Sequence, residues 1–428
     1  MLYAGMVAYA APLPVGVPLG GYAFREGVSV GTHDPITATA LVVRQGRSTV
    51  AIVSVDLVAV TSALRQRVLA LLAVDPGLRP EQVLLAATHT HSGPGGPHAD
   101  LHDGGAYYDA DTADRLAATI ARAVRDAHRD AHRDAEPVSV RAWAGVASGV
   151  ASDRVTAVVD VSVPAAVAVL STPGGRTIGA VANYACHPTV LDESNLEFSA
   201  DYVHATRQTL RERLGTPVVL FLNGACGDLS TRYSRRAATF DEAARLGGVA
   251  ADHLAALVTD PPADTEIRSH PAVDTRTELV NVRCRRPTPQ VTRDALHGAM
   301  PAGPSSRAVR AARYSLELEE RLAATHAGRD LRLPVQVLRF GPVAVVGLSV
   351  ELFSAWRPRW DDAFPGVVML ACYANDYHGY AVRPETPAEA YERANSWLPD
   401  TAGGTLVDAA TRLLGRQSGG PVRHGTTS

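Results

Sequence analysis

Apolar residues recur along the chain with two different periods, which predict strands and helices that follow one another. Short apolar or β-branched runs predict strands at Ile36–Val43, Thr49–Val55, Val83–Ala87, Val138–Ala144, Thr177–Tyr184, Val218–Leu222, Val335–Phe340, Val343–Val350 and Gly366–Tyr373. Apolar residues spaced three and four apart predict helices at Ser62–Ala73, Asp111–Ala131, Tyr202–Leu214, Asp241–Val258, Arg307–Ala327 and Thr405–Leu414. This alternation predicts an α/β fold with a central mixed, largely buried β-sheet flanked by helices.

Two stretches show neither period and are predicted to be loops. Gly93–Gly104 is rich in Gly, Pro and His, and Arg285–Ser306 is rich in Pro, Arg and Ser. The second stretch could divide the chain internally. We therefore expect one domain over residues 1–415, which could divide near 285–306, and a flexible tail over 416–428.

Composition excludes several classes of protein. A formal net charge of -3 gives no basic field for nucleic acid. No stretch approaches the roughly 20 apolar residues of a membrane-spanning helix. The N-terminus lacks a basic segment and its apolar run is interrupted by prolines, so we expect no signal peptide and a cytoplasmic protein.

The cysteines are scattered and form no Cys-x-x-Cys pair, which argues against a Cys-rich zinc site and against a disulfide scaffold. Two of them, Cys186 and Cys226, follow predicted strands and could be nucleophiles. Isolated cysteines in such places are more often small buried fillers, and we adopt that interpretation.

A histidine pair follows the predicted strand Val83–Ala87 directly, in the run Thr88-His89-Thr90-His91-Ser92-Gly93. Alternate residues of a strand point the same way, so His89 and His91 can face one pocket. Ligands in α/β folds usually bind at the carboxyl ends of strands. Taken alone, His-x-His is equally compatible with two exposed loop histidines.

Other predicted strands also end in residues that can do chemistry. His187 follows Thr177–Tyr184, Asn223–Ser230 follows Val218–Leu222, and Glu351 follows Val343–Val350. The last strand leads into Tyr373–Tyr380. Zinc prefers nitrogen and oxygen ligands in a tetrahedral site, which two histidines and a carboxylate would satisfy. The pattern therefore indicates one shared metal site at a sheet edge.

Two further sets of residues receive a structural interpretation. His128 and His132 would share one helical face, but the glutamate of the zincin motif is missing and charges surround them, so we expect a solvated helix end. Asp56, Asp201 and Asp228 also follow strands, where each could orient a ligand or cap a loop.

Together these residues resemble the neutral/alkaline non-lysosomal ceramidase family, in the family's order and over most of the chain. The segments that carry the resemblance are Gly20-Gly21-Tyr22, Gly31–Pro35, Thr88–Gly96, Asn183–Thr189, Ser199–Tyr202, Asn223–Ser230, Leu348–Phe353, Asn375–Tyr380 and Tyr391-Glu392.

The resemblance implies a ceramidase-like catalytic domain that holds zinc through His89, His187, Glu351 and Tyr380, with Tyr377 as the alternative tyrosine. It further implies that His91 lies in the second shell or transfers a proton, that Ser230 is the essential serine, and that Arg154 is the active-site arginine.

Three features depart from the family's pattern. We expect no C-terminal immunoglobulin-like domain and no export signal, and the family's Ser-Pro element is replaced by Ser230-Thr231. These departures keep the metal chemistry and favour a soluble substrate over long-chain ceramide. Arg154 and Arg232 could then hold an acidic group of such a substrate.

The predicted function is zinc-dependent hydrolysis of an amide bond in a small-molecule or lipid N-acyl substrate. Zinc lowers the pKa of a bound water to ~7. His91 would relay a proton, while Ser230 and backbone amides near Gly224–Gly227 would hold the oxyanion. An acyl-serine route is less favoured because the Gly-x-Ser-x-Gly elbow is missing. Two alternatives are an amidase, esterase or acyl-transfer enzyme in a biosynthetic pathway and a non-catalytic binding protein. The oligomeric state is left open.

Overall fold

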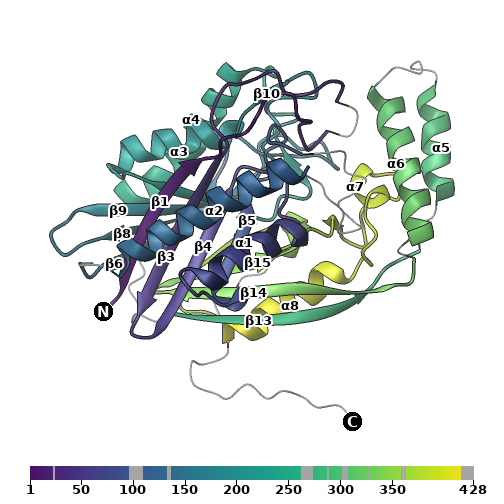
Figure 1. The fold of residues 1–428 in the computed structure, drawn as a ribbon. Helices are drawn as coiled ribbons and strands as arrows, with labels where there is room; N and C mark the ends of the chain where they lie inside the picture. The colour runs from purple at the N-terminus through teal and green to yellow at the C-terminus, as the bar shows by residue number, and fades with distance from the viewer. Residues whose placement is uncertain are drawn as a thin grey trace, which may run out of the picture.

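The strands of the computed structural model form three four-stranded mixed sheets with the same connectivity. In each sheet three strands run antiparallel in chain order, and a fourth lies parallel to the third. The predicted α/β class is confirmed, with three small sheets in place of one central sheet (Figure 1). The structure describes residues 1–22, 25–95, 109–132, 136–261, 273–286, 289–300, 307–325, 327–357, 360 and 363–415.

The sheets are built from consecutive thirds of the chain. The first contains β1 (Tyr3–Ala10), β3 (Thr37–Gln45), β4 (Ser48–Val55) and β5 (Val83–Ala87). The second contains β6 (Ser139–Ala147), β8 (Val163–Ser171), β9 (Thr177–Tyr184) and β11 (Val219–Asn223). The third contains β13 (Val273–Arg283), β14 (Asp330–Phe340), β15 (Val343–Leu348) and β17 (Val367–Ala371).

Three two-stranded ladders tie the loops together at the carboxyl ends of these strands. They pair β2 (Gly31–Thr32) with β10 (Glu197–Phe198), β7 (Ser152–Asp153) with β12 (Leu229–Ser230), and β16 (Glu351–Leu352) with β18 (Tyr380–Ala381).

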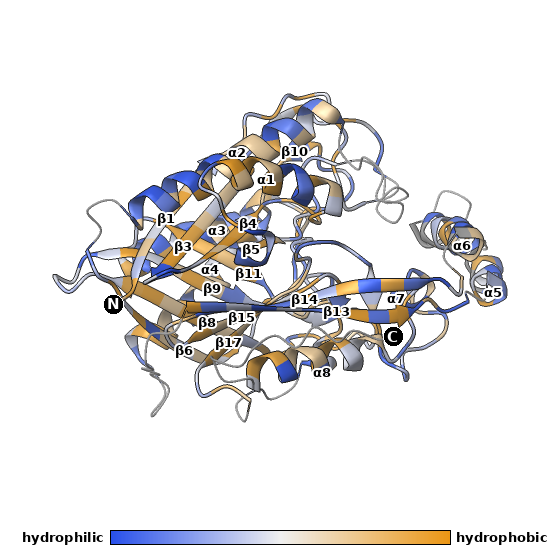
Figure 2. Cartoon of the chain, turned by 60° about the horizontal axis from the view of Figure 1, so that its bottom comes forward, coloured by the Kyte–Doolittle hydropathy of each residue, from blue (hydrophilic) through white to orange (hydrophobic). Residues whose placement is uncertain are grey.

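Helices cover the outer face of each sheet. Helices α1 and α2 lie over the first sheet, α3 and α4 over the second, and α8 over the third, on the far side from α1 and α2 (Figure 2). Their bounds are α1 (Ser62–Val74), α2 (Ala110–Asp130), α3 (Tyr202–Leu214), α4 (Phe240–Thr259), α5 (Pro289–Ala299), α6 (Arg307–Thr325), α7 (Tyr391–Ala394) and α8 (Ala402–Gly415), with 3-10 turns at Pro80–Gln82 and Ser354–Trp356.

The inner faces of the three sheets share one apolar cluster, which includes Ile52 of β4, Leu220 of β11 and Met369 of β17. The sheets approach each other closely, because a Cβ atom added at Gly347 of β15 would lie 2.7 Å from a methyl carbon of Leu84 on β5. Strands buried on both faces need apolar residues throughout, which explains the nearly continuous apolar runs in the sequence.

The predicted elements agree with the structure best where a strand or helix is buried. β5, β9 and α3 have the predicted bounds. The sequence pattern does not predict the longer strands β1, β8 and β13; β13 lies at a sheet edge and is mostly half-buried or exposed, with only Val273, Val280 and Val282 buried.

The prediction of a loop over Arg285–Ser306 is wrong for α5 (Pro289–Ala299). Proline at the first position of a helix removes no intrahelical hydrogen bond, so Pro289 can start a helix. α5 and α6 form a hairpin between β13 and β14 (Figure 1), and these two strands pair along their whole length. The third sheet thus continues across the suggested division. Residues 287–288, 301–306, 96–104 and the suggested tail 416–428 lie outside the described residues.

A buried ion pair ties the first sheet to α3. Asp56, directly after β4, accepts hydrogen bonds from Nη1 and Nη2 of Arg207 at 2.9 and 2.8 Å and from the amide and hydroxyl of Thr37. Both charged side chains are almost fully buried. Across the ranges described above, no helix is long and apolar enough to cross a bilayer.

We predict that Asp56→Ala lowers the free energy of unfolding by about 3 to 5 kcal/mol, because it leaves the buried Arg207 guanidinium without its counter-charge. Urea unfolding of chelator-treated protein would measure this without a contribution from bound metal. Asp252→Ala is the control, because it breaks the exposed pair of Arg213 and Asp252 at 3.2 Å and should cost at most about 1 kcal/mol. Equal losses in the two variants would contradict the prediction.

Candidate metal centre

The carboxyl ends of strands from all three sheets meet at one place. Asn223, the last residue of β11, donates to the backbone oxygens of Thr88 at 3.0 Å and Cys186 at 3.2 Å, which follow β5 and β9. Ala374, after β17, forms an antiparallel bridge with Ala86 of β5. Residues that follow these strands therefore share one small volume.

His89 lies two residues beyond β5 in a left-handed backbone conformation, with φ of 69°. A non-glycine residue rarely adopts this conformation, and it turns the ring away from the strand direction. The buried Nδ1 lies 2.5 Å from the backbone oxygen of Val58, so Nδ1 carries the proton and Nε2 is left as an acceptor.

His187 is held in the same way from the second sheet. Its Nδ1 lies 2.7 Å from the backbone oxygen of Cys226 and 2.9 Å from that of Leu229. Burial lowers the pKa of the imidazole to about 3, so the ring is neutral. Its proton must sit on Nδ1, because carbonyl oxygens only accept. Nε2 is again a bare acceptor.

Glu351 is the first residue of β16, shortly after β15 of the third sheet, and places a carboxylate oxygen near both imidazole rings. Its Oε2 lies 3.0 Å from Nε2 of His187 and 3.4 Å from Nε2 of His89. Within the described part of the chain, neither Nε2 of His187 nor Oε2 of Glu351 has a hydrogen-bond partner. Buried acceptors that face one another at this distance require a cation between them. Two imidazole nitrogens and a carboxylate are a donor set that zinc accepts.

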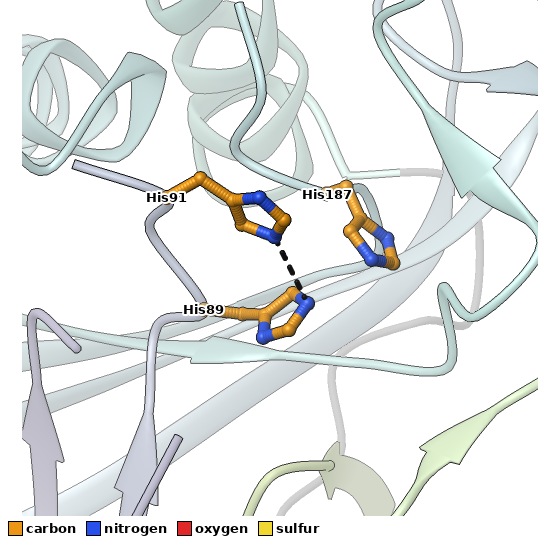
Figure 3. A group of neighbouring side chains, drawn as sticks. All are labelled: His89, His91 and His187. Atoms are coloured by element: carbon orange, nitrogen blue, oxygen red, sulfur yellow. Dashed lines mark hydrogen bonds between the residues drawn. The ribbon is translucent and has the colours of Figure 1, made fainter. Parts of the chain in front are cut away.

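His91 joins the same cluster (Figure 3). Its Nε2 lies 3.4 Å from Nε2 of His89, and nitrogens of the three histidines lie within 4.8 Å of one another. His89 and His91 do face one pocket, although strand alternation is not the reason, since β5 ends at Ala87. His91, predicted to act in the second shell, is therefore also placed where it could bind metal.

The Gly20-Gly21-Tyr22 segment fixes the position of His91. A Cβ atom at Gly21 would lie 2.3 Å from Cγ of His91, and Gly21 has φ of 94°. The ring of Tyr22 meets His91 edge-on with centroids 4.9 Å apart. Only glycine allows this close approach in this conformation.

The structure separates the two candidate tyrosines. Tyr380 pairs with Glu351 across β16 and β18, but its hydroxyl accepts a hydrogen bond from Nη2 of Arg154 at 3.2 Å. The hydroxyl of Tyr377 donates to Oε1 of Glu351. Arg154 also forms an ion pair with Glu392 at 3.0 Å. The roles predicted for Tyr380 and Tyr377 stay predictions.

Ser230 lies beside the cluster, because it forms a parallel bridge with His187. Its buried hydroxyl accepts from the amide of Arg232 at 3.2 Å, which leaves its own proton free to donate. The predicted oxyanion amides are wrong for two glycines: Gly224 donates to Tyr184 and Gly227 donates to Leu352.

Tyr373 was missed as a supporting residue, although it lies in the segment singled out after the last strand. Its ring stacks on His89 with centroids 3.8 Å apart and 10° between the planes. Its hydroxyl contacts Sγ of Cys226 at 3.2 Å, and the backbone oxygen of Cys226 holds His187. Tyr373 thus connects two of the predicted metal ligands.

The other candidates have structural roles. All four cysteines are buried and free, which confirms the filler interpretation, and burial raises the pKa of the Cys186 and Cys226 thiols. Asp201 caps α3 and accepts from the amides of the loop after His187. Asp228 accepts from the amide and hydroxyl of Ser354, just beyond Glu351.

His128 and His132 stack on each other near the end of α2, with ring centroids 3.9 Å apart. His132 Nδ1 lies 2.8 Å from the backbone oxygen of His128, and both belong to the outer helix layer. Neither is in the histidine cluster that could hold a metal.

Comparison with known proteins agrees with this architecture. The model of the family "Neutral/alkaline non-lysosomal ceramidase, N-terminal" matches residues 12–141. The crystal structure of neutral ceramidase from Pseudomonas aeruginosa is similar with a TM-score of 0.73 and 21% identity, over 97% of this chain and 74% of that one. A ceramidase complexed with C2 is similar with a TM-score of 0.72 and 19% identity, over 97% and 75%. No curated protein matches the chain in sequence. The resemblance inferred from the motifs is confirmed.

We predict that Tyr373→Phe weakens zinc binding about 10-fold to 100-fold, the range typical of residues that orient metal ligands. The change keeps the ring on His89 and removes the contact with Cys226. Competition with a chromophoric chelator would measure the affinity. The matched control is Tyr184→Phe, because within the described residues that buried hydroxyl has no hydrogen-bond partner. Unchanged affinity in Tyr373→Phe would show that the hydroxyl plays no part.

Proposed function

We propose that this chain, whose fold is that of the neutral ceramidases, is a zinc-dependent hydrolase of the amide bond in N-acyl substrates. One observation carries the proposal: His187 Nε2 and Glu351 Oε2, which have no hydrogen-bond partner among the described residues, converge with Nε2 of His89, and each of the three residues follows a strand of a different four-stranded sheet. The family match over residues 12–141 includes His89 and supports a ceramidase-like hydrolase.

The chain's own residues can carry out the remaining steps. Zinc, when bound, would supply Lewis acidity to the amide carbonyl and to a water molecule. His91 lies at the cluster, where its imidazole would take up a proton from an attacking water and donate one to the leaving amine. Ser230 can donate its hydroxyl proton to the developing oxyanion.

Arg154 acts indirectly in this scheme. Its guanidinium is held by the Gly227 oxygen at 2.7 Å and by Glu392, and it fixes the hydroxyl of Tyr380. Tyr380 is the proposed fourth ligand, and Tyr377, which donates to Glu351, is the alternative. Buried positioning of this kind keeps catalytic groups close to their reactive geometry.

The same proposed metal site could also serve a different substrate or a different reaction. An amidase, esterase or acyl-transfer enzyme of a biosynthetic pathway would use the same metal and serine. A binding protein would not need the converging acceptors together with Ser230, so a catalytic role is favoured. Turnover of long-chain N-acylsphingosine and of short soluble N-acyl amides by zinc-loaded protein tests the proposal. If the zinc-loaded protein hydrolyses neither class of substrate, the proposal is refuted.

We predict that the protein holds close to one zinc per chain and that His187→Ala loses most of it. The variant lacks one of the few nitrogen ligands of the proposed zinc site, and the carboxylate of Glu351 loses its neighbour His187 Nε2 at 3.0 Å. Elemental analysis after dialysis measures the content. His128→Ala is the control, since His128 lies on the surface helix α2. Full zinc retention in His187→Ala would contradict the assignment.

We predict that Ser230→Ala keeps its zinc and loses about 10²-fold to 10³-fold in kcat, as expected when an oxyanion donor is removed. The serine hydroxyl accepts a hydrogen bond from the amide of Arg232, and Ser230 is not in the histidine cluster that could hold a metal. Steady-state kinetics on the best accepted amide, with zinc content measured on the same sample, decide the question. Turnover equal to that of the unchanged protein would mean that Ser230 is structural.

A further inference from the structure

Arg232 lies on a turn that is fixed from several sides. The amides of Ser234 and Arg235 both donate to the backbone oxygen of Thr231, at 3.2 and 2.8 Å. The amide of Tyr233 donates to Oγ of Ser152 at 3.1 Å. The amide of Arg232 itself donates to Oγ of Ser230 at 3.2 Å. The base of its side chain is therefore held at a defined place beside the proposed oxyanion serine.

The guanidinium group of Arg232 is exposed and forms no hydrogen bond or ion pair with the described residues. Its neighbours in the turn differ. Arg235 donates to the backbone oxygens of Thr189 and Val190, and the backbone amide of Arg236 donates to Oε1 of Glu242 at 2.8 Å. Arg232 is the exposed arginine of this turn that lies nearest to Ser230 in the sequence.

The charge of Arg232 acts on Tyr391, whose ring contacts that of Tyr380. Tyr391, whose ring meets that of Tyr380 edge-on at 6.4 Å, is 37% exposed and so borders the solvent. Burial raises the pKa of the Tyr391 hydroxyl to about 12, while the charges of Arg154 and Arg232 oppose this rise. Arg232 and Arg154 thus act on the same phenol, one from the surface and one from the interior.

Arg154 is excluded as a substrate anchor, contrary to the expectation from sequence. Its side chain is 9% exposed and pairs with Glu392 at 3.0 Å. A substrate carboxylate would have to displace a carboxylate that is already buried and paired. Arg232 has no such competitor among the described residues, and a guanidinium can bind a carboxylate through two parallel hydrogen bonds.

We propose that Arg232 binds a carboxylate of the substrate, so that the preferred substrates are N-acyl amides with an acidic group near the scissile bond, such as N-acyl amino acids. The inference rests on the proposed function and names its substrate class. Two residues of extended chain span at most about 7 Å, so the arginine starts close to Ser230 and suits an acid a few bonds from the amide. An exposed cation near Ser230 also attracts anions over longer distances.

The test compares N-acylglycine with the N-acylglycinamide of the same acyl chain, which differs only in that charge. The unchanged enzyme should have the larger kcat/KM for the acid. Arg232→Ala should raise KM for the acid about 10-fold to 100-fold, the value of a charge-assisted hydrogen bond, and leave the amide unchanged. Arg232→Lys should restore part of the preference. Arg236→Ala, in the same loop, should behave as the unchanged enzyme.

Zinc content of each variant separates a loss of substrate binding from a loss of the metal centre. Equal losses on both substrates in Arg232→Ala, or no preference for the acid in the unchanged enzyme, would overturn the inference. If the enzyme hydrolyses neither substrate, the proposed function fails and the inference is decided by binding alone. Calorimetric titration with N-acylglycine should then show weaker binding to Arg232→Ala, and equal binding would overturn it.

Discussion

The structure is organised around three buried acceptors that face one another. Nε2 of His89, Nε2 of His187 and Oε2 of Glu351 lie 3.0 to 3.4 Å apart along the Glu351 contacts. The Nδ1–H group of each imidazole donates a hydrogen bond to a backbone oxygen. Such an arrangement is repulsive without a cation, and it joins ends of all three sheets. A cation bound among these groups would therefore couple its binding free energy to the final packing of these loops.

The sheets can present these ligands because each ends in the same way. The third and fourth strands of each sheet run parallel, so their carboxyl ends lie at one edge with backbone groups that need partners. Asparagine side chains supply them. Asn183 exchanges hydrogen bonds with Leu370 of another sheet, and Asn375 accepts from the amide of Leu85. A side-chain amide carries the same donor and acceptor as the backbone and can replace a missing strand.

This dependence on contacts between sheets sets the limit of prediction from sequence. The periods of apolar residues identify β5, β9 and α3, and strand ends followed by His89, His187 and Glu351 indicate their convergence. The sequence does not specify the left-handed conformation of His89, nor the stacking of Tyr373 on it. Both depend on residues far along the chain that meet only in the folded state. The helix α5 was missed for a local reason, since Pro289 can start a helix as well as break one.

The two arginines near the centre show why residue type alone does not decide a role. Arg154 donates to the Gly227 oxygen and the Tyr380 hydroxyl and forms an ion pair with Glu392, so its charge is neutralised inside the protein. Arg232 has a fixed backbone, and its exposed guanidinium has no hydrogen bond or ion pair with the residues that the structure describes. In the proposed scheme a neutral lipid amide would give that exposed cation nothing to bind, whereas an acidic amide would gain an ion pair. The same metal chemistry can therefore serve a different substrate class when one loop after the serine changes, while the buried ligands stay as they are.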